Sequence, residues 1–197
     1  SLVLDSTEAL PPTLTRIDAL AFWGCTALNL RALPPNLTKI KSKSFAGCTS
    51  LVLDSSEALP PTLTEIQASA FEGCTALKLQ ALPPTLTRID SKAFAGCISL
   101  VLDSSEALPP TLTEIQSSAF EGCKALKLQT LPPTLTSIDT KAFAGCKSLA
   151  LGNAVPLPPK LQSVGSEAFV DCDLLRDTPF GIAIRNLQPN AFLITST

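Results

Sequence analysis

Seven cysteines are the side chains with the most obvious capacity for chemistry, and they recur at alternating intervals of 23 and 26 residues. Thiolate metal sites use Cys-x-x-Cys pairs or cysteine with histidine, and the sequence contains neither arrangement. All but the last cysteine follow Phe-x-Gly, and a free cysteine in apolar surroundings behaves as a small buried hydrophobe. We interpret the column as core packing, with disulfides between neighbouring repeats as the alternative. The column consists of Cys25, Cys48, Cys74, Cys97, Cys123, Cys146 and Cys172.

Other residues for catalysis are missing from the sequence. There is no histidine, no glycine-rich loop suited to a phosphate, and no acidic pair outside the duplicated pattern. An active site would ordinarily interrupt a repeat, because its residues are needed once rather than in every copy. We therefore expect no enzymatic activity, no cofactor and no metal ion.

The composition narrows the class of partner. Hydrophobic residues make up 45% of the 197 residues, which argues against disorder, and the formal net charge is −2. A nucleic-acid-binding protein would carry a basic patch, and the longest uncharged stretches are too short to cross a bilayer. We expect a protein partner, either a ligand or neighbouring subunits of an assembly, with no nucleic acid and no membrane insertion.

The cysteines belong to an internal repeat whose most regular feature is Leu-Pro-Pro. These tripeptides also alternate between spacings of 23 and 26 residues, so the unit of duplication is 49 residues. Residues 1–49, 50–98 and 99–147 align without a gap, and residues 148–197 are a degenerate copy. We expect residues 1–197 to form a single domain and, because Ser1 lies inside a repeat, to be a fragment of a longer chain. The tripeptides begin at Leu10, Leu33, Leu59, Leu82, Leu108, Leu131 and Leu157.

Each repeat predicts short extended segments separated by turns. Alternating leucines after the cysteine, such as Leu77 and Leu79, predict a strand. Pro-Pro marks a turn, Thr-Leu-Thr-x-Ile resumes an extended stretch, and Ala-Phe-x-Gly-Cys is compact, as in a single helical turn. The extra residues of the longer repeat lie in a polar loop at residues 103–107. One repeat buries its apolar residues only against its neighbours, so we predict a repeat solenoid of about eight coils.

The last of these coils is degraded. Residues 180–192 align with the repeat and place Ile184 at the inner leucine, Leu187 at the isoleucine and Phe192 at the phenylalanine. Thr195 falls where the cysteine would stand, which suits a terminal capping repeat. Stacking of the coils then predicts one aromatic spine that contains Phe22, Phe45, Phe71, Phe94, Phe120, Phe143, Phe169 and Phe192.

The pattern L-P-x-x-L-x-x-I-x-x-x-A-F-x-G-C-x-x-L resembles the BspA-like class of leucine-rich repeats over residues 1 to about 177. The resemblance implies a right-handed leucine-rich-repeat arc of short parallel strands and short helical turns or loops. It also implies a protein that binds host or matrix proteins at a microbial surface, which would place the chain at the cell surface or outside the cell. The doubled proline and the strict 23/26 alternation depart from the usual copy and leave the curvature of the arc open.

Two columns of side chains beside the alternating leucines are the candidate docking surface. Leucine-rich repeats generally line their concave face with strands, so we expect these columns to face a ligand. The alternative is a solvated face whose variety records only the duplication. The candidate residues are Asn29, Val52, Lys78, Val101, Lys127, Arg31, Asp54, Gln80, Asp103 and Gln129, and the columns continue to Ala150 and Gly152.

The second extended segment carries two further columns. Lys39, Glu65, Arg88 and Glu114 alternate in sign, so we expect ion pairs between coils that help to fix their register. Thr-x-Thr recurs beside this column, and a stacked array of threonines resembles an ice-binding surface. Threonine is also simply a good strand residue.

The sequence therefore predicts a non-catalytic recognition or scaffold module, with surface adhesion as the finer expectation. A structural spacer or assembly subunit is the first alternative, and it predicts that open ends of the solenoid contact neighbouring chains. An ice-binding array is the second alternative.

Overall fold

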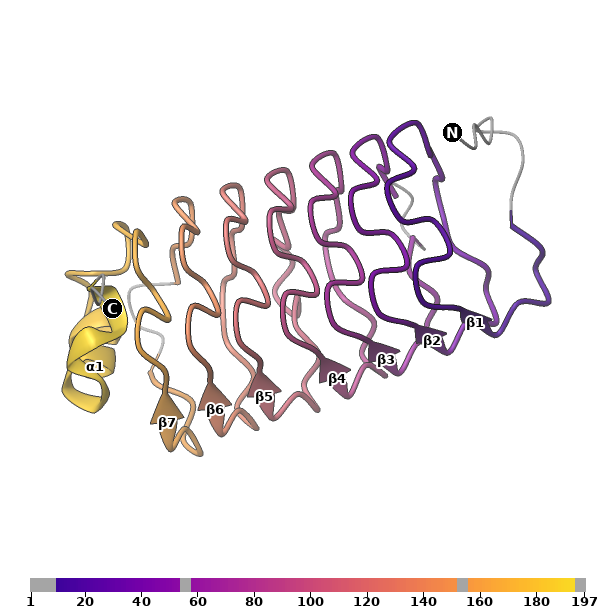
Figure 1. Cartoon of the computed structure of the whole chain (residues 1–197). Coiled ribbons are helices and arrows are strands. Elements are labelled where there is room, and N and C mark those ends of the chain that lie inside the picture. The colour runs from indigo at the N-terminus through magenta and orange to yellow at the C-terminus, as the bar shows by residue number, and fades with distance from the viewer. Residues whose placement is uncertain (1–9, 54–57, 152–155, 194–197) are drawn as a thin grey trace.

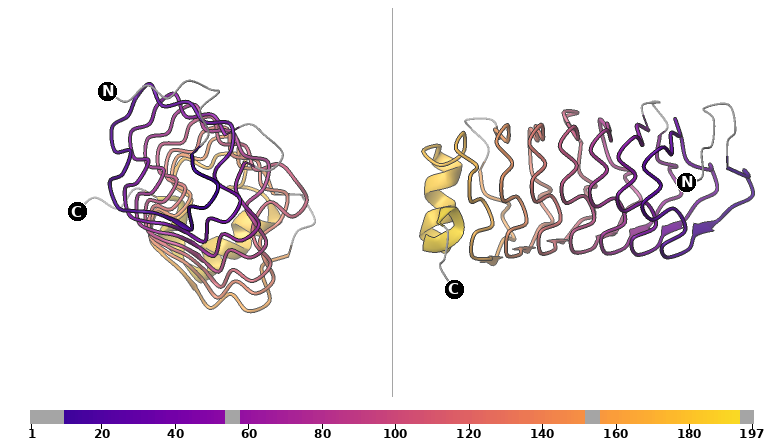
Figure 2. Two further views of the ribbon diagram at one scale, coloured as in Figure 1. Left: turned by 90° about the vertical axis from the view of Figure 1, so that its right-hand side faces the viewer. Right: turned by 45° about the horizontal axis from the view of Figure 1, so that its top comes forward.

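A computed structural model describes residues 10–53, 58–151 and 156–193. The chain forms an elongated solenoid whose coils lie side by side in chain order (Figure 1). Seen along the axis of the stack, the coils follow one closed outline (Figure 2). The predicted repeat solenoid is confirmed. We number the coils by their Leu-Pro-Pro or equivalent start, as coil 1 (10–32), coil 2 (33–58), coil 3 (59–81), coil 4 (82–107), coil 5 (108–130), coil 6 (131–156) and coil 7 (157–178).

Each coil contributes one two-residue strand, and all strand pairs are parallel. The strands form a four-stranded sheet, β1 to β4, and a three-stranded sheet, β5 to β7. In each strand the second residue, isoleucine or valine, is buried, and the first is exposed or half-buried. The strands are β1 (Arg16–Ile17), β2 (Lys39–Ile40), β3 (Glu65–Ile66), β4 (Arg88–Ile89), β5 (Glu114–Ile115), β6 (Ser137–Ile138) and β7 (Ser163–Val164).

The strand predicted at the alternating leucines after each cysteine is not formed, so that prediction was wrong. Leu53 and Leu102 have positive φ angles of 50° and 51°, which lie outside the extended region. Neighbouring coils are still linked there, for example by the Lys78 amide, which donates to the Val52 carbonyl at 3.0 Å. The leucines are buried, so their pattern correctly indicated core positions. The strands form instead at the Thr-x-Ile segments.

Two backbone ladders join successive coils, and they run in opposite directions. On the strand side, the amide of the later coil donates, as from Thr38 to the Thr15 carbonyl at 2.8 Å. On the side of the Phe-x-Gly-Cys turns, the amide of the earlier coil donates, as from Phe22 to the Ser44 carbonyl at 2.8 Å. This turn-side ladder crosses the junction between β4 and β5, where the sheet is interrupted. The coils therefore form one continuous stack.

The predicted phenylalanine spine is confirmed. Rings of successive coils stack with centroids 5.2 to 5.6 Å apart and interplanar angles of 2° to 22°. The phenylalanines of coils 2 to 7 are fully buried, and Phe22 of coil 1 is half-buried. At these separations nearly parallel rings are offset, which is a favourable arrangement for aromatic quadrupoles.

A column of thiols runs beside the spine. All seven cysteines are free, and six of them are buried. Each of these six donates its Sγ–H to the phenylalanine carbonyl of the preceding coil, as Cys48 does to Phe22 at 3.0 Å. Burial raises the pKa of Cys48 to about 12, so the thiol stays protonated at neutral pH. Core packing is confirmed for these six, whereas Cys25 is half-exposed.

The Phe-x-Gly-Cys segments are tight turns rather than the helical turn that the sequence suggested. The Cys48 amide donates to the Phe45 carbonyl at 3.0 Å, and Gly47 has a φ of +76°. A Cβ on Gly47 would lie 3.6 Å from the Cα of Gly24, so the glycines let the turns approach closely. The Pro-Pro turn is confirmed by the bond from the Leu86 amide to the Pro83 carbonyl at 3.0 Å.

The C-terminal segment differs from the predicted eighth coil. It forms α1 (Pro179–Leu187) and η1 (Pro189–Phe192), and Thr195 lies outside the described residues. Thr178 caps α1 by accepting a hydrogen bond from the Gly181 amide, and proline at the first helical position suits a helix start. Ile184 is buried as predicted, but Leu187 is 48% exposed and forms no strand. Phe192 does continue the spine, so the segment closes the end of the stack (Figure 1).

Candidate interaction surface

Two faces of the solenoid carry the residues that the sequence singled out. We call the outward residues of β1 to β7 and their immediate neighbours the sheet face. We call the outward residues that flank the alternating leucines after each cysteine the leucine face. Because the strands form at the Thr-x-Ile segments, the predicted docking columns belong to the leucine face and not to the two sheets.

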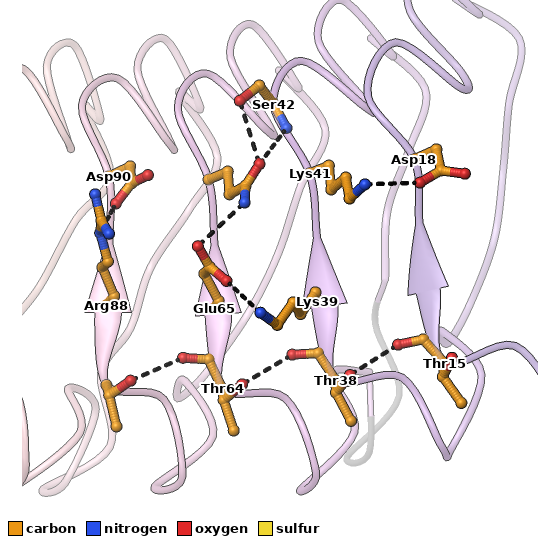
Figure 3. Close-up of polar contacts among 12 residues, drawn as sticks. Thr15, Asp18, Thr38, Lys39, Lys41, Ser42, Thr64, Glu65, Arg88 and Asp90 are labelled. Atoms are coloured by element: carbon orange, nitrogen blue, oxygen red, sulfur yellow. Dashed lines mark hydrogen bonds and ion pairs between the residues drawn. The ribbon is translucent and has the colours of Figure 1, made fainter.

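Threonines on the sheet face form a hydrogen-bonded ladder (Figure 3). The Oγ1 hydroxyls of Thr38, Thr64 and Thr87 each donate to the carbonyl of the equivalent threonine in the preceding coil, at 3.0, 3.2 and 3.2 Å. Each of these carbonyls also accepts the backbone amide of the same threonine. The ladder gives the recurrence of threonine a structural role, because it satisfies the second lone pair of each exposed carbonyl.

Charged residues of β1 to β4 are paired (Figure 3), whereas Glu114 of β5 forms no ion pair with another described residue. Lys39 and Glu65 lie 3.3 Å apart, which confirms one predicted pair between coils. Arg88 pairs instead with Asp90 of its own coil, two residues along the extended chain. A hydrogen bond from Gln67, together with Lys39, lowers the pKa of Glu65. Salt bridges between exposed groups contribute only about 0–1 kcal/mol, so their clearest effect is to neutralise the charges at β1 to β4.

Those charged groups of the leucine face that the structure describes form no ion pairs with other described residues. Lys78 and Lys127 are exposed, stand at equivalent positions of the 49-residue copies, and form no ion pair with another described residue. Val52 and Val101 beside them are half-buried. Asp54 lies outside the described residues. The other predicted residues are exposed, namely Asn29, Arg31, Gln80, Asp103 and Gln129.

A hollow of about 480 Å³ opens on this face across coils 4 to 7. It brings together three predicted residues, Asp103, Lys127 and Gln129, and the Gln129 amide donates to the Asp103 carbonyl at 2.8 Å. The remaining predicted residues do not line it. Ala150, which continues one of the predicted columns, also lines it, and three residues outside those columns complete the lining, namely Leu128, Ser148 and Leu174.

The hollow results from departures from the repeat. Ala150 stands where the earlier copies have Val52 and Val101, so two methyl groups are missing from the face. Leu174 replaces an alanine of the earlier copies and is 56% exposed, so it forms an apolar wall. Both substitutions, Ala150 and Leu174, are visible in the sequence as breaks in the 49-residue pattern. Only the stacking of the coils shows that they line the same hollow.

The arrangement suits binding rather than catalysis. An apolar floor and wall beside one lysine and one aspartate can hold an apolar side chain flanked by charged groups. Within the described ranges, no cluster of histidine, cysteine, aspartate and glutamate is arranged to hold a metal ion. In the same part of the chain, no helix has the length and hydropathy needed to span a membrane.

Solved structures with the same architecture are leucine-rich repeat proteins. A T. pallidum leucine-rich repeat protein is 33% identical, with a TM-score of 0.74 over 95% of this chain and 82% of its own. A leucine-rich repeat protein from Bacteroides ovatus is 29% identical, with a TM-score of 0.69 over 83% of this chain. The chain spans 40% of the length of that protein. The curated proteins include no match to this sequence.

The sequence also matches the BspA type leucine-rich repeat region, in six copies, over residues 6–106 and 64–197. These matches include every described residue and agree with the parallel strands of the stacked coils. Leucine-rich repeats of this kind are modules for protein interaction, typically without enzymatic activity. The chain belongs to the BspA-type leucine-rich repeat family.

Proposed function

We propose that the chain is a non-catalytic recognition module that binds a protein ligand through its leucine face. The hollow at coils 4 to 7 is the observation that carries this proposal, because it combines apolar surface with free charged groups. Attachment to a host or matrix protein at the cell surface is the setting that the family suggests. The hollow is the centre of contact, and the columns toward the N-terminus extend it.

Charge supports the leucine face over the sheet face. The sheet-face lysines Lys39 and Lys41 are already paired, with Glu65 at 3.3 Å and with Asp18 at 3.1 Å. Lys78 and Lys127 have no such partner among the described residues, so both can bind acidic groups of a ligand without first breaking an ion pair. The ligand therefore presents an apolar side chain near acidic residues.

The test is quantitative capture of partners from extracts of the source organism and of its host. The chain and the variant Lys78→Glu/Lys127→Glu serve as parallel baits, and captured proteins are quantified by mass spectrometry. The double substitution reverses two charges on the leucine face, so we expect a genuine ligand to bind about tenfold or more weakly. Direct titration of the identified ligand then measures the difference in Kd.

The chain offers a matched control in Lys43→Glu/Lys92→Glu. These lysines are exposed, are also 49 residues apart, and lie in the turns before Phe45 and Phe94, on another side of the coil. The control changes the net charge by the same amount and should retain the ligand. Equal loss in both variants would show a general charge effect, and equal retention in both would place the binding site elsewhere.

A spacer or assembly role is the second candidate, and one observation favours it. The N-terminal end of the stack exposes Leu20 and Trp23, which are 52% and 66% exposed. An assembly subunit would bury these residues against another element, and the leucine-face variants would leave that contact unchanged.

A further inference from the structure

A further column of side chains borders the leucine face, formed by the residue that directly follows each cysteine. We call it the post-cysteine column. Its first members are threonines that form a ladder: Thr49 Oγ1 donates to the Thr26 carbonyl at 3.4 Å, and Thr75 Oγ1 donates to the Thr49 carbonyl at 3.2 Å. The later coils replace these threonines. The column consists of Thr26, Thr49, Thr75, Ile98, Lys124, Lys147 and Asp173.

The replacements in this column coincide with the hollow. Ile98, Lys124 and Lys147 belong to coils 4 to 6, and the hollow opens across coils 4 to 7. Backbone hydrogen bonds hold these coils in register there. The Ala125 amide donates to the Ile98 carbonyl at 3.2 Å, and the Ser148 amide donates to the Lys124 carbonyl at 3.1 Å. Because Ser148 lines the hollow, Lys124 and Lys147 lie beside it, at equivalent positions of neighbouring coils.

Lys124 and Lys147 are unpaired cations. Both are exposed, and neither forms an ion pair with another described residue, including Asp173, the next member of the column. Like charges at equivalent positions of neighbouring coils repel each other. A carboxylate between the two ammonium groups would reduce this repulsion and pair with both. The threonines that they replace would continue the ladder, so the fold itself does not require these charges.

The surroundings of the hollow are polarised along the coil. The two lysines directly follow their cysteines, whereas the acidic group of the hollow, Asp103, comes later in its coil, at the same position as Gln129 in the next. Ala150 and Leu174 supply the apolar floor and wall between these groups. A ligand segment that follows the coil therefore meets cations first, then apolar surface, then a carboxylate.

We propose that the hollow binds an extended acidic segment of the protein ligand, an inference that rests on the proposed recognition function and specifies the chemistry of its ligand. One aliphatic side chain of the segment packs on Ala150 and Leu174. Neighbouring carboxylates pair with Lys124 and Lys147. The acidic residues lie on one side of the aliphatic residue only, because Asp103 repels them on the other. In an extended chain, side chains two residues apart point to the same side and lie about 6.5 Å apart, so the segment carries aspartate or glutamate two residues from the aliphatic one.

A purely anionic ligand, such as a sulfated polysaccharide, fits the site less well. It would pair with the lysines but leave the apolar wall in water, where Leu174 is 56% exposed. It would also gain nothing from the methyl groups that are missing at Ala150. The apolar floor and wall and the lysine pair are separate departures from the repeat, and an acidic segment with an aliphatic side chain is a ligand that uses both.

The test is selection of a phage-displayed library of random linear peptides on the full chain, followed by titration of the enriched peptides by fluorescence anisotropy. Three variants return the site to residues that other coils carry at the same positions, so each keeps a side chain that the fold accepts. Ala150→Val fills the hollow, and Leu174→Ala removes its wall. Lys124→Thr/Lys147→Thr restores the threonines of the post-cysteine column.

The matched control is Lys43→Ser/Lys92→Ser. It removes the same charge at exposed positions outside the leucine face. Ser69 and Ser118 stand at the equivalent position of other coils with nearly the same φ, 58° against 57° and 59° for the two lysines, so the control also keeps to residues of the repeat.

Enriched peptides should share an aliphatic residue with aspartate or glutamate two residues away, on the same side in all of them. Ala150→Val and Leu174→Ala should each weaken their binding by about tenfold. Lys124→Thr/Lys147→Thr should weaken it by about fivefold at low salt and less at high salt, whereas the control should bind as the original chain does.

The proposal is overturned if selection enriches no peptide, if the enriched peptides lack the acidic and aliphatic pair, or if the three variants bind them unchanged. Loss in the lysine variant alone would also overturn it, in favour of a site for anionic groups only. Partners captured from extracts separate this inference from the proposed function. A partner lost in Lys78→Glu/Lys127→Glu but retained in Ala150→Val and Lys124→Thr/Lys147→Thr would leave recognition by the leucine face standing and remove the acidic segment. A partner retained in every variant would remove both.

Discussion

Alkaline pH should unfold the solenoid through its buried thiols. Six cysteines are buried, and burial raises the pKa of Cys48, Cys123 and Cys172 from 9.0 to about 12. Burial also raises the pKa of the other three, Cys74, Cys97 and Cys146. Each Sγ faces a carbonyl oxygen, so a thiolate there would meet a like partial charge in place of a hydrogen-bond acceptor. The folded chain therefore retains its thiol protons at a pH where the unfolded chain releases them.

The sign and size of the effect follow from linkage. Below the ordinary pKa of 9.0 both states are protonated and the thiols contribute their full stability, which is lost as the pH rises toward 12. At pH 10 each buried thiol lowers the free energy of unfolding by roughly 1 kcal/mol, and the six together by several kcal/mol. This is comparable with the total stability of a native domain, about 5–15 kcal/mol. The sequence has no tyrosine, and no lysine is buried among the described residues.

The assay is urea unfolding followed by circular dichroism between pH 8 and 11 in the presence of a phosphine reductant. Near pH 10.5 the free energy of unfolding should fall by roughly 1 kcal/mol per pH unit for each buried thiol. Cys97→Ala removes a buried thiol and should make the slope shallower by that amount, whereas Cys25→Ala should leave it unchanged. A wild-type stability that stays level to pH 11, or equal slopes in all three proteins, would refute the reasoning.

Other consequences of the stack can be checked in the same preparations. Phe94→Ala should lower the free energy of unfolding by about 3–5 kcal/mol, because its fully buried ring stacks on the rings of both neighbouring coils. Phe22→Ala should lower it distinctly less, because its ring is half-buried and stacks on one neighbouring ring. Similar losses for the two variants in urea unfolding would contradict the role of the spine. Ellman's reagent should modify Cys25 alone in the native protein and all seven thiols after unfolding, and a native count above one would mean that the column opens. A double-mutant cycle on Lys39 and Glu65 should give a coupling of about 0.2–1 kcal/mol that disappears in high salt.

The core could be predicted from the sequence because its residues recur in every coil. A phenylalanine and a cysteine at fixed positions in each repeat must form columns once the coils stack, and burial is the only environment that suits both. Phe192 extended the prediction to the degraded end, although the chain between Pro179 and Leu187 turned out to be helical. The helix had its own signal in Thr178 followed by proline, which the alignment with the repeat obscured.

The position of the strands could not be predicted from the leucine pattern. Alternating leucines indicate one buried side of an extended chain, and in coils 1 to 6 both leucines are indeed buried, as Leu100 and Leu102 are. At Leu53 and Leu102, however, the positive φ angle lies outside the extended region, and leucine carries no sequence signal for that conformation. In the Thr-x-Ile segment, the threonine hydroxyl and backbone amide both donate to the preceding coil, as at Thr87, and the strands form there.

The hollow could not be predicted because its parts come from different coils. Ala150 and Leu174 lie 24 residues apart, and each is a separate departure from the 49-residue pattern. Only the register of the stack places the missing methyl groups of one coil beside the added side chain of the next. The sequence also does not indicate which of the predicted residues line the hollow. Asp103, Lys127 and Gln129 do, whereas Lys78 lies outside the lining.

Recognition in this fold must therefore come from departures from the repeat. The groups shared by the coils are already engaged: threonine hydroxyls and cysteine thiols bind the preceding coil, and the phenylalanine rings bind each other. A ligand that contacted only repeated features would also find the same features 49 residues away, so binding would have several registers along the solenoid. Ala150 and Leu174 occur together once among the described coils, as do Leu20 and Trp23, and only such singular pairs can give one partner a unique position.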